Sequence, residues 1–436
     1  MALGTRWSPL RPHAIQNGYF RSPHRFNIVP AGRRSGKTEL AKRKLVKAAL
    51  RGTKFDGARF FAAAPTRDQA KGIYWADLKA LVPSEFKSGR PIETELVIPL
   101  INGSEISVVG MDKPERIEGR PWDGGILDEY GNMKEKAWPE NVRPALSDRL
   151  GWCDFIGVPE GRNHYYDLTE KAREQLAALG LKSPWGVFEW ASADILDPAE
   201  IAAAKSDLHP LVFEQEYGGK FVDFSGVAIF DIEKFLTDGQ PINSYPPHCD
   251  AVFAIIDTAV KTGKDNDGTG VIFFATSKHG GIPLLILDWD LIQIQGAMLE
   301  SWLPSVFARL EQLAALCGAR MGSLGAMIED KSSGMVLLQH AANKGWPARA
   351  IPETLTALGK DERALSTSGY HYNGRCKISR TAYDKTVMYK GAMRNHLLRQ
   401  ISDFRLGDPD AAKRADDVLD CYTYGLAMTF GNEEGY

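Results

Sequence analysis

The chain has few cysteines, and they lack the pairing that would give them a structural role. Its 436 residues include five cysteines, an odd number, and no two of them form a CxxC pair. A structural zinc site needs closely spaced cysteines, and a disulfide framework needs an even number of them. We therefore exclude both and expect a reducing, cytosolic setting. The five are Cys153, Cys249, Cys317, Cys376 and Cys421.

Long apolar runs and an excess of one charge are also lacking. No apolar stretch reaches the roughly 20 residues that cross a bilayer, and the N-terminus lacks the pattern of a signal peptide. The formal net charge is -2, so any binding to nucleic acid would have to use local basic patches. With 44% hydrophobic and 25% charged residues, the composition predicts a globular protein of two or three domains.

A loop rich in glycine and basic residues is the most informative feature that is present. Residues 31–38 read Ala-Gly-Arg-Arg-Ser-Gly-Lys-Thr, between a short apolar run at 26–29 and a helical pattern from Glu39. A strand, a loop ending Gly-Lys-Thr and a helix form the phosphate cradle of P-loop NTPases. Lys37 would bind the outer phosphates, and Thr38 would be a ligand of Mg²⁺. The predicted nucleotide-binding residues of the loop are Gly32, Arg33, Arg34, Ser35, Gly36, Lys37 and Thr38.

A second motif follows about ninety residues later. Residues 124–129 read Gly-Gly-Ile-Leu-Asp-Glu, which is typical of a Walker B strand. Asp128 would hold the Mg²⁺ shell, and Glu129 would be the general base that polarises the attacking water. Alone, the first motif could be a basic surface loop and the second an acidic turn, but the two in this order favour nucleotide hydrolysis. Ala31 departs from the pattern, since the first position of the loop is usually glycine.

Other polar residues near these motifs leave alternatives open. Gln16 precedes the loop and has an amide that can read an adenine edge, although an ordinary polar residue on a short helix is an equal reading. Arg33 could compensate the charge that builds up on the phosphoryl group in hydrolysis. Arg143 or Arg149 could do so from a neighbouring subunit, but a structural ion pair is slightly favoured for these two.

The first half of the chain alternates strand and helix patterns, which predicts an α/β fold with a parallel sheet. Strands are expected at 26–29, 58–65, 95–99, 105–109, 125–127 and 152–158, with a hairpin turn at Asn102-Gly103. Thr66 is expected to cap a helix that runs to residue 81. The alternation weakens near residue 211, and three prolines follow at 241, 246 and 247. We expect a first domain at 1–210, a linker region at 211–248 and a second domain at 249–436.

Acidic residues mark the second domain. Strands are expected at 251–257, 270–275, 283–287 and 326–328, helices at 300–316 and 421–430. Asp257 ends the first strand, Glu329 and Asp330 end the fourth, and Asp416, Asp417 and Asp420 open the last helix. This is the layout of an RNase H-like nuclease, in which acids bind two Mg²⁺ or Mn²⁺ ions that activate water and stabilise the leaving oxygen. Each cluster alone would be the solvated end of an element.

A basic stretch lies between the acid clusters, from Lys377 to Arg414. It would hold a phosphate backbone without regard to sequence, or it is a set of solvated helix faces, and the two readings weigh equally. It comprises Lys377, Arg380, Lys385, Lys390, Arg394, Arg399, Arg405, Lys413 and Arg414.

Taken together, these motifs resemble the large terminase subunit of tailed bacteriophages, the motor and nuclease that packages DNA. Residues 31–38 resemble the family's deviant Walker A motif, Arg33 falls at its catalytic cis arginine, and Gln16 falls at its adenine-reading position. Asp112 and residues 116–119 resemble the segment that leads to Walker B. Residues 158–163, Val-Pro-Glu-Gly-Arg-Asn, are similar to the coupling motif, except that Val158 replaces its usual threonine. This departure argues against a hydroxyl that senses the γ-phosphate there.

The resemblance continues in the second half and implies a fold and partners. Asp257, the run at 328–334 and Asp416-Asp417 are similar to the family's nuclease acids, with Glu329 preferred over Asp330 and Asp417 over Asp416. The implied fold is an ASCE-type P-loop NTPase domain followed by an RNase H-like domain. The implied cofactors are ATP with Mg²⁺ and two Mg²⁺ or Mn²⁺ ions. The implied partners are double-stranded DNA, the small terminase subunit and the portal protein of the procapsid. A ring of copies on the portal is expected in the host cytoplasm, and a monomer is the alternative for the isolated chain.

Three hypotheses for function follow. The first is a viral DNA-packaging motor subunit that hydrolyses ATP to translocate double-stranded DNA and cuts concatemeric DNA with a two-metal endonuclease. The second is a cellular ATP-dependent helicase or repair nuclease, which would need strand-separating motifs and stacking aromatics that we do not find. The third is an assembly scaffold whose P-loop binds nucleotide without hydrolysing it.

Overall fold

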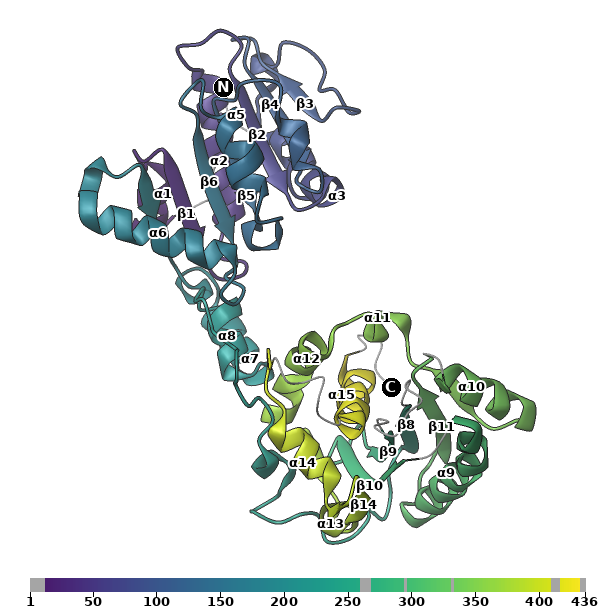
Figure 1. Cartoon of the computed structure of the whole chain (residues 1–436). Helices are drawn as coiled ribbons and strands as arrows, with labels where there is room; N and C mark the ends of the chain where they lie inside the picture. Colours follow the sequence, from purple (N-terminus) through teal and green to yellow (C-terminus); the bar gives the residue numbers. More distant parts are fainter. Residues whose placement is uncertain (1–11, 259–267, 294–295, 331–332, 409–415, 432–436) are drawn as a thin grey trace. The chain divides into compact units, whose positions relative to one another are not determined.

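The chain divides into two compact units (Figure 1). The computed structural model describes residues 12–258, 268–293, 296–330, 333–408 and 416–431. The first unit is the chain up to Ala204 together with Pro210–Asp223, and the second is Lys205–His209 with the chain from Phe224 onward. No helix among the described residues is long and apolar enough to cross a membrane.

The segment 211–248, expected to be a linker, is divided between the units. Its start forms most of helix α8 (Pro210–Glu216) and belongs to the first unit. Phe221 packs edge-on against Tyr165 of that unit. Phe230 and Phe235 are buried in the core of the second unit. The burial of these aromatic side chains therefore attaches the start of the segment to the first unit and its later part to the second. The prolines of the segment did not indicate this division.

The first unit is built on a seven-stranded sheet in the order β3-β4-β2-β5-β6-β1-β7. Every pairing is parallel except the β3–β4 hairpin, which Asn102-Gly103 joins as expected. The strands are β1 (Phe26–Pro30), β2 (Arg59–Ala64), β3 (Val97–Pro99), β4 (Glu105–Gly110), β5 (Gly124–Asp128), β6 (Trp152–Gly157) and β7 (Trp185–Val187). The predicted α/β fold with a parallel sheet is confirmed, and β7 is an additional strand.

Helices cover both faces of this sheet, because alternate residues of each central strand point to opposite sides. Phe60 and Ala62 of β2 pack with Leu45 of α2, while Phe61 and Ala63 pack with Tyr165 of α6. Thr66 caps α3 with a capping box, as expected, but the helix predicted to reach residue 81 contains a π-helical turn at Lys71–Trp75. The helices are α1 (Ala14–Phe20), α2 (Lys37–Arg51), α3 (Arg67–Ala70), α4 (Ala76–Leu81), α5 (Arg143–Ala145), α6 (His164–Leu179) and α7 (Pro198–Asp207), followed by α8.

The second unit has a six-stranded sheet in the order β12-β11-β8-β9-β10-β13. Strand β9 runs antiparallel to both neighbours, while β11 and β12 run parallel to β8. This is the RNase H-like arrangement: a three-stranded antiparallel meander, then parallel strands added on the far side of the first strand. The strands are β8 (Ala251–Asp257), β9 (Thr269–Thr276), β10 (Leu284–Ile292), β11 (Ser323–Ile328), β12 (Ala348–Ala350), β13 (Cys376–Ile378), β14 (Val387–Tyr389) and β15 (Ala392–Arg394).

The two faces of this sheet carry different helices. Phe253 and Ile255 of β8 lie in a core with Val418 and Tyr422 of α15, and Val252, Ala254 and Ile256 lie in another with α9. The helices are α9 (Gly296–Leu316), α10 (Ser333–Lys344), α11 (Glu353–Thr356), α12 (Lys360–Tyr372), α13 (Arg380–Asp384), α14 (His396–Asp403) and α15 (Asp417–Phe430). Strands β14 and β15 form a separate hairpin.

Candidate active sites

The glycine-rich loop has the backbone of a phosphate cradle. It connects the end of β1 at Pro30 to the start of α2 at Lys37. Gly36 has φ of 80°, in the left-handed region that favours glycine. A Cβ on Gly32 would lie 2.4 Å from the Ser192 Oγ and 2.4 Å from the Tyr217 carbonyl, so only glycine fits. Ala31 is fully buried and its N–H donates to the Gly157 carbonyl at 3.2 Å, so the methyl group at the first position lies in the core of the unit.

A cavity of about 600 Å³ opens over this loop. Its lining joins the loop to Glu129 after β5, to Val158-Pro159-Glu160 after β6 and to Glu216 of α8. The structure thus brings together at one edge of the sheet the P-loop, the predicted general base and the segment similar to a coupling motif. The lining residues are Arg33, Arg34, Ser35, Gly36, Lys37, Thr38, Glu39, Glu129, Asn132, Val158, Pro159, Glu160 and Glu216.

Lys37 and Asp128 are both buried at this site. The Lys37 side chain is 6% exposed, and burial lowers its pKa. Asp128 is 1% exposed and accepts hydrogen bonds from the Thr38 hydroxyl at 3.1 Å and the Tyr74 hydroxyl at 2.8 Å. Burial, followed by the neighbouring Glu129, raises the pKa of Asp128 from 3.8 to about 6. A hydroxyl and a carboxylate in contact at the phosphate end of the cradle are the donors that Mg²⁺ prefers, so these residues fit that ion.

Glu129 has an unusual backbone conformation. Its φ of 51° and ψ of 47° are left-handed, a conformation that costs a non-glycine residue roughly 1–3 kcal/mol and concentrates at functional sites. The turn directs the chain from β5 into Tyr130, whose side chain is buried, while Glu129 stays at the cavity. Sequence patterns carry no sign of this strain.

Gln16 forms a hydrogen bond with the backbone of the loop. Its amide nitrogen donates to the Ser35 carbonyl at 2.8 Å, and the Trp190 indole donates to the same oxygen at 3.0 Å. Gln16 is 3% exposed and is not among the residues that line the cavity. The structure therefore gives Gln16 a contact with the loop itself, and adenine recognition stays a prediction.

The three arginines considered for charge compensation lie in two places. Arg33 is at the cavity and forms an ion pair with Glu216, a partner that the sequence did not indicate. Arg149 pairs with Asp123 at 2.6 Å, and Arg143 lies 4.9 Å above the ring of Phe26. Asp123 and Phe26 stand at the amino ends of β5 and β1, whereas the loop follows the carboxyl end of β1. Only Arg33 is therefore placed to act within its own chain.

In the second unit, three predicted acids come together at neighbouring element ends. Asp257 ends β8, and Glu329 follows β11, the parallel neighbour of β8, with its N–H donating to the Ile256 carbonyl at 3.3 Å. Asp417 opens α15 and accepts from the Gly268 N–H at 3.3 Å. A Cβ on Gly270 of β9 would lie 3.0 Å from the Asp417 carbonyl oxygen, so the helix start is pressed onto the sheet there. Burial, then Asp420, Glu329 and Asp417, raise the pKa of Asp257 well above its usual range.

The donor chemistry of these acids fits hard divalent cations, although the described residues form no preformed metal site. Within the described residues, no group of three or more His, Cys, Asp or Glu side chains is arranged so that it could hold a metal ion. The available donors are carboxylates, and a bound cation would offset both effects that raise the pKa of Asp257, which are burial and then the charges of Asp420, Glu329 and Asp417. Two ions about 3.5–4 Å apart are bound by carboxylates spread over a wider span than one ion needs.

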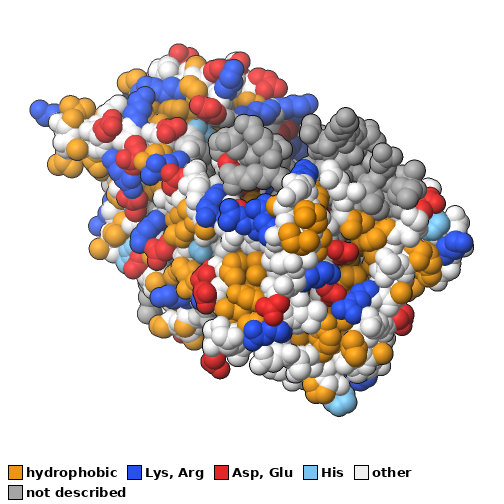
Figure 2. All heavy atoms as spheres, turned by 60° about the horizontal axis from the view of Figure 1, so that its bottom comes forward, with side chains coloured by type: hydrophobic (Ala, Val, Ile, Leu, Met, Phe, Trp, Pro, Cys, Tyr) orange, Lys and Arg blue, Asp and Glu red, His pale blue; other side chains and the backbone are white. Residues whose placement is uncertain are grey.

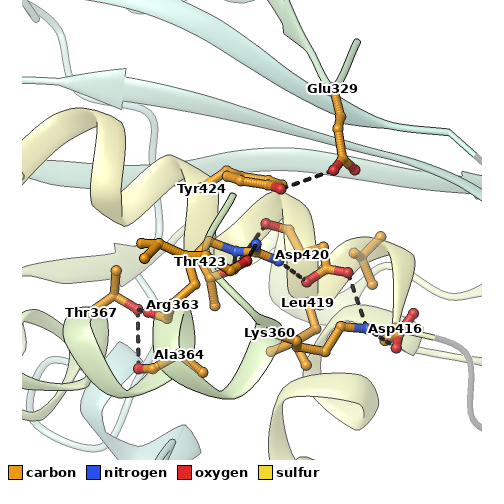
Figure 3. Close-up of polar contacts among 12 residues, drawn as sticks. Glu329, Lys360, Arg363, Ala364, Thr367, Asp416, Leu419, Asp420, Thr423 and Tyr424 are labelled. Carbon is orange, nitrogen blue, oxygen red and sulfur yellow. Dashed lines mark hydrogen bonds and ion pairs between the residues drawn. The ribbon is translucent and has the colours of Figure 1, made fainter. Parts of the chain in front are cut away.

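The other three predicted acids differ from this trio. Asp330 is exposed. Lys360 of α12 forms ion pairs with both Asp416 and Asp420, at 3.1 Å for the latter, and Arg363 forms a second ion pair with Asp420 (Figure 3). Their charges are therefore balanced by cations of α12. The sequence analysis missed these two basic residues, because nothing in their spacing distinguishes them from a solvated helix face.

The basic stretch after α12 separates into two groups. Lys377 donates to the carbonyls of Lys234 and Leu236, Arg380 donates to the Asn243 side chain at 2.8 Å, and Lys385 pairs with Asp288, so these have structural roles. Four others line a cavity of about 300 Å³, together with Lys360 and Asp416: Lys390, Arg394, Arg399 and Arg405. Lys413 and Arg414 lie outside the described residues. Figure 2 shows basic side chains interspersed with acidic and hydrophobic ones on the face it presents, in keeping with local patches instead of one basic surface.

Comparison with known proteins finds a family model that matches residues 28–237. The family is described as "Terminase large subunit, T4likevirus-type, N-terminal". The large terminase subunits of Thermus phage G20c and Thermus virus P23-45 are each 27% identical over 254 residues, an alignment that covers 52% of this chain and 52% of theirs. The chain thus spans about half the length of the curated relatives it matches.

Solved structures extend the likeness to the whole fold. The large terminase of a thermophilic bacteriophage aligns with a TM-score of 0.64 at 14% identity, covering 96% of this chain and 99% of that one. The same protein in complex with ADP aligns with a TM-score of 0.59 at 13% identity and covers 98% of both chains. At this identity the agreement concerns the fold, and it spans both units.

Proposed function

We propose that this chain, whose residues 28–237 match the model of the terminase large-subunit family, is a viral DNA-packaging motor subunit. The first unit would hydrolyse ATP to translocate double-stranded DNA into a procapsid, and the second would cut concatemeric DNA. One observation carries the proposal: a phosphate cradle in which Thr38 contacts the buried Asp128 and a cluster of acids at strand ends occur in one chain, each within its own compact unit.

Hydrolysis would use the residues around the first cavity. The loop N–H groups and Lys37 bind the phosphates, and Thr38 with Asp128 holds Mg²⁺, which when bound neutralises phosphate charge. Glu129 accepts a proton from the water that attacks the γ-phosphorus, and the β-phosphate oxygen leaves. Arg33, freed from Glu216, stabilises the charge on the transferred group. The position of Glu129 and Arg33 on the lining of the same cavity as Lys37 supports these roles.

DNA cutting would use Asp257, Glu329 and Asp417. These carboxylates would hold two Mg²⁺ or Mn²⁺ ions, which when bound activate water and stabilise the leaving oxygen of the phosphodiester. The adjacency of the ends of β8 and β11 supports this assignment. Lys390, Arg394, Arg399 and Arg405 line a cavity in the same unit and would contact the phosphate backbone. In this proposal the partners are double-stranded DNA, the small terminase subunit and the portal protein, and a ring of copies acts in the host cytoplasm.

The test measures both activities in parallel. Plasmid cutting with Mn²⁺ and phosphate release with ATP, Mg²⁺ and DNA are followed for wild type, Lys37→Ala and Asp257→Ala. Lys37→Ala should abolish phosphate release and leave cutting intact, because Lys37 belongs to the first unit only. Asp257→Ala should do the reverse.

Three outcomes would contradict the proposal. Equal loss of both activities in both variants would rule out two separate sites. Absence of phosphate release from the wild type, with DNA and Mg²⁺ present, would favour a scaffold that only binds nucleotide. Unwinding of forked DNA that depends on Lys37 would favour a helicase.

A further inference from the structure

Arg363 is a buried cation at the centre of the contacts between α12 and α15. It is 4% exposed, and its guanidinium donates to Asp420 with one terminal nitrogen and to the Thr423 hydroxyl, at 3.0 Å, with Nε. Its Cζ lies 4.0 Å from the centre of the Tyr424 ring. Positions 420, 423 and 424 share one face of α15, since they are three and four residues apart. A single arginine of α12 therefore contacts a whole turn of α15 (Figure 3).

Tyr424 carries this contact to the acid cluster. Its hydroxyl donates to Glu329 Oε1 at 3.1 Å, and the ring is 1% exposed. Figure 3 shows the tyrosine between Arg363 and Glu329, with the hydroxyl directed at the carboxylate. Because the hydroxyl lies at the end of a rigid ring, it fixes the position of one carboxylate oxygen more tightly than a flexible side chain would.

The cations of α12 neutralise one part of the acid cluster. Lys360 and Arg363 compensate Asp416 and Asp420, so these two acids already have cationic partners. Glu329 accepts a hydrogen bond from the neutral Tyr424 hydroxyl, which orients its carboxylate without adding a charge. A carboxylate that binds a metal benefits from this kind of support, because partners of ligand side chains fix their geometry and are typically worth 10–100-fold in metal affinity.

We propose that Arg363 and Tyr424 are positioning residues of the nuclease site. Arg363 locks the Tyr424 ring against α12, Tyr424 orients the Glu329 carboxylate toward Asp257 and Asp417, and Asp420 is the counter-ion of Arg363. This inference rests on the proposed nuclease function, and it assigns roles to two residues that no sequence motif marks.

The experiment uses the full chain without nucleotide and compares two tyrosine variants on the same helix. Tyr424→Phe removes the hydroxyl that reaches Glu329 and keeps the ring over Arg363. Tyr422→Phe is the matched control, since Tyr422 is fully buried and its hydroxyl contacts His371 at 2.7 Å, away from the acids. Calorimetric titration with Mn²⁺ measures binding directly, with Asp257→Ala as the reference that lacks the site.

Tyr424→Phe should weaken Mn²⁺ binding by about 10-fold and raise by a similar factor the Mn²⁺ concentration needed for plasmid cutting. The rate at saturating Mn²⁺ should fall much less, because the carboxylate itself remains. Tyr422→Phe should bind Mn²⁺ like the wild type. Arg363→Lys keeps the charge and loses the planar contact with the ring. Its affinity for Mn²⁺ should lie between those of Tyr424→Phe and Tyr422→Phe.

Two results would overturn the inference. Equal Mn²⁺ binding by Tyr424→Phe and wild type would show that the hydroxyl does not position Glu329. Equal weakening in both tyrosine variants would reduce the contact to a general effect on α15. If the wild type itself neither binds Mn²⁺ more tightly than Asp257→Ala nor cuts DNA, the nuclease function fails, and the positioning role fails with it.

Discussion

Strand β5 of the first unit and strand β8 of the second both end in an aspartate within a sheet, and the two aspartates have different surroundings. Asp128 accepts from two hydroxyls and lies in the electrostatic reach of Lys37. Asp257 is surrounded by Asp420, Glu329 and Asp417, all of the same charge sign. Lys360 and Arg363 form ion pairs with Asp416 and Asp420.

This difference indicates what each site can bind first. Under the proposed function, the basic side chains and loop N–H groups that line the cavity of the first unit would receive Mg²⁺ and a polyphosphate together as one complex. In the second unit, the excess negative charge would have to be neutralised by cations before a DNA phosphate could approach. Similar strand ends would therefore serve opposite orders of assembly. The following predictions test that contrast, from the largest expected effect to the smallest.

The largest effect is expected from a variant that replaces a single oxygen atom of Glu129 and should change only the first site. Glu129→Gln removes the base next to Asp128 and should lower phosphate release by about 10²–10⁴-fold, while nucleotide still binds because Lys37 and the loop are unchanged. Plasmid cutting with Mn²⁺ should stay at the wild-type rate. Single-turnover phosphate release and filter binding of ATP measure the two quantities. A parallel loss of nucleotide binding would show that Glu129 shapes the cradle and is not its base.

The next effect concerns two neighbouring buried aspartates of the first unit. Asp154 in β6 is fully buried, pairs with Lys44 at 2.9 Å and accepts from Tyr19 and Asn27. Asp154→Asn should therefore destabilise the first unit by about 2–4 kcal/mol, because Lys44 loses its partner. Asp128→Asn should stabilise it by about 1–2 kcal/mol, since the raised pKa corresponds to at most about 3 kcal/mol and asparagine keeps one acceptor.

The sign of the Asp128 effect follows from its pKa. The folded-state pKa of about 6 lies above the ordinary 3.8, so the contribution of Asp128 to stability is fully present below pH 3.8 and is lost as the pH rises through about 6. The gain from Asp128→Asn should consequently be small at pH 4.5 and full at pH 8. Calorimetric unfolding without nucleotide, at both pH values, measures it. Destabilisation by Asp128→Asn at pH 8 would show that Asp128 is as well compensated as Asp154.

The contrast between the sites also explains how far the sequence could predict them. The first site depends on eight consecutive residues, and local spacing dictated Gly32, Gly36, Lys37 and Thr38. Even there, the reason that position 32 must be glycine lies in Ser192 and Tyr217, far along the chain. Glu216, the partner of Arg33, was unpredictable for the same reason: an acid on α8 has no local mark of its contact.

The second site depends on residues separated by up to 160 positions. Acids at the ends of apolar strands were recognisable, because adjacent parallel strands bring their carboxyl ends to one edge. The ion pairs of Asp420 with Lys360 and Arg363 were not recognisable, since they depend on α12, a helix that the sequence analysis did not identify. Arg363 and Tyr424 are assigned by side-chain packing between two helices, which has no sequence period of its own.

A third prediction uses pH to compare metal binding at the two sites. Mg²⁺ competes with the proton on Asp128, so the Mg²⁺ concentration that half-saturates ATP hydrolysis should rise by about tenfold per unit as the pH falls below about 6. Above pH 7 it should be flat. The pKa of Asp257 is also raised, first by burial and then by Asp420, Glu329 and Asp417, so the Mn²⁺ requirement of plasmid cutting should likewise rise as the pH falls. Initial rates over a grid of metal concentration and pH test both sites, and a requirement that does not change with pH would show that no proton competes with the metal at that site.

The smallest expected effect concerns the amino ends of the strands, opposite the first cavity. Arg149 is tied to Asp123, which also accepts from the Thr53 hydroxyl and the Arg59 N–H, both at 2.8 Å. Arg149→Gln leaves Asp123 with these donors, so the loss should be only about 1 kcal/mol, or a fall of roughly 2–4 °C in the melting temperature of the first unit. ATP hydrolysis per folded, isolated chain should not change, because Arg149 lies at the opposite ends of the strands from the cavity. The matched variant Arg143→Gln, which loses only a stacking contact with Phe26, should shift the melting temperature less. If Arg149→Gln instead lowered hydrolysis only when copies assemble on DNA, at unchanged stability, Arg149 would act on the cavity of a neighbouring copy and the amino ends of the strands would belong to a shared site.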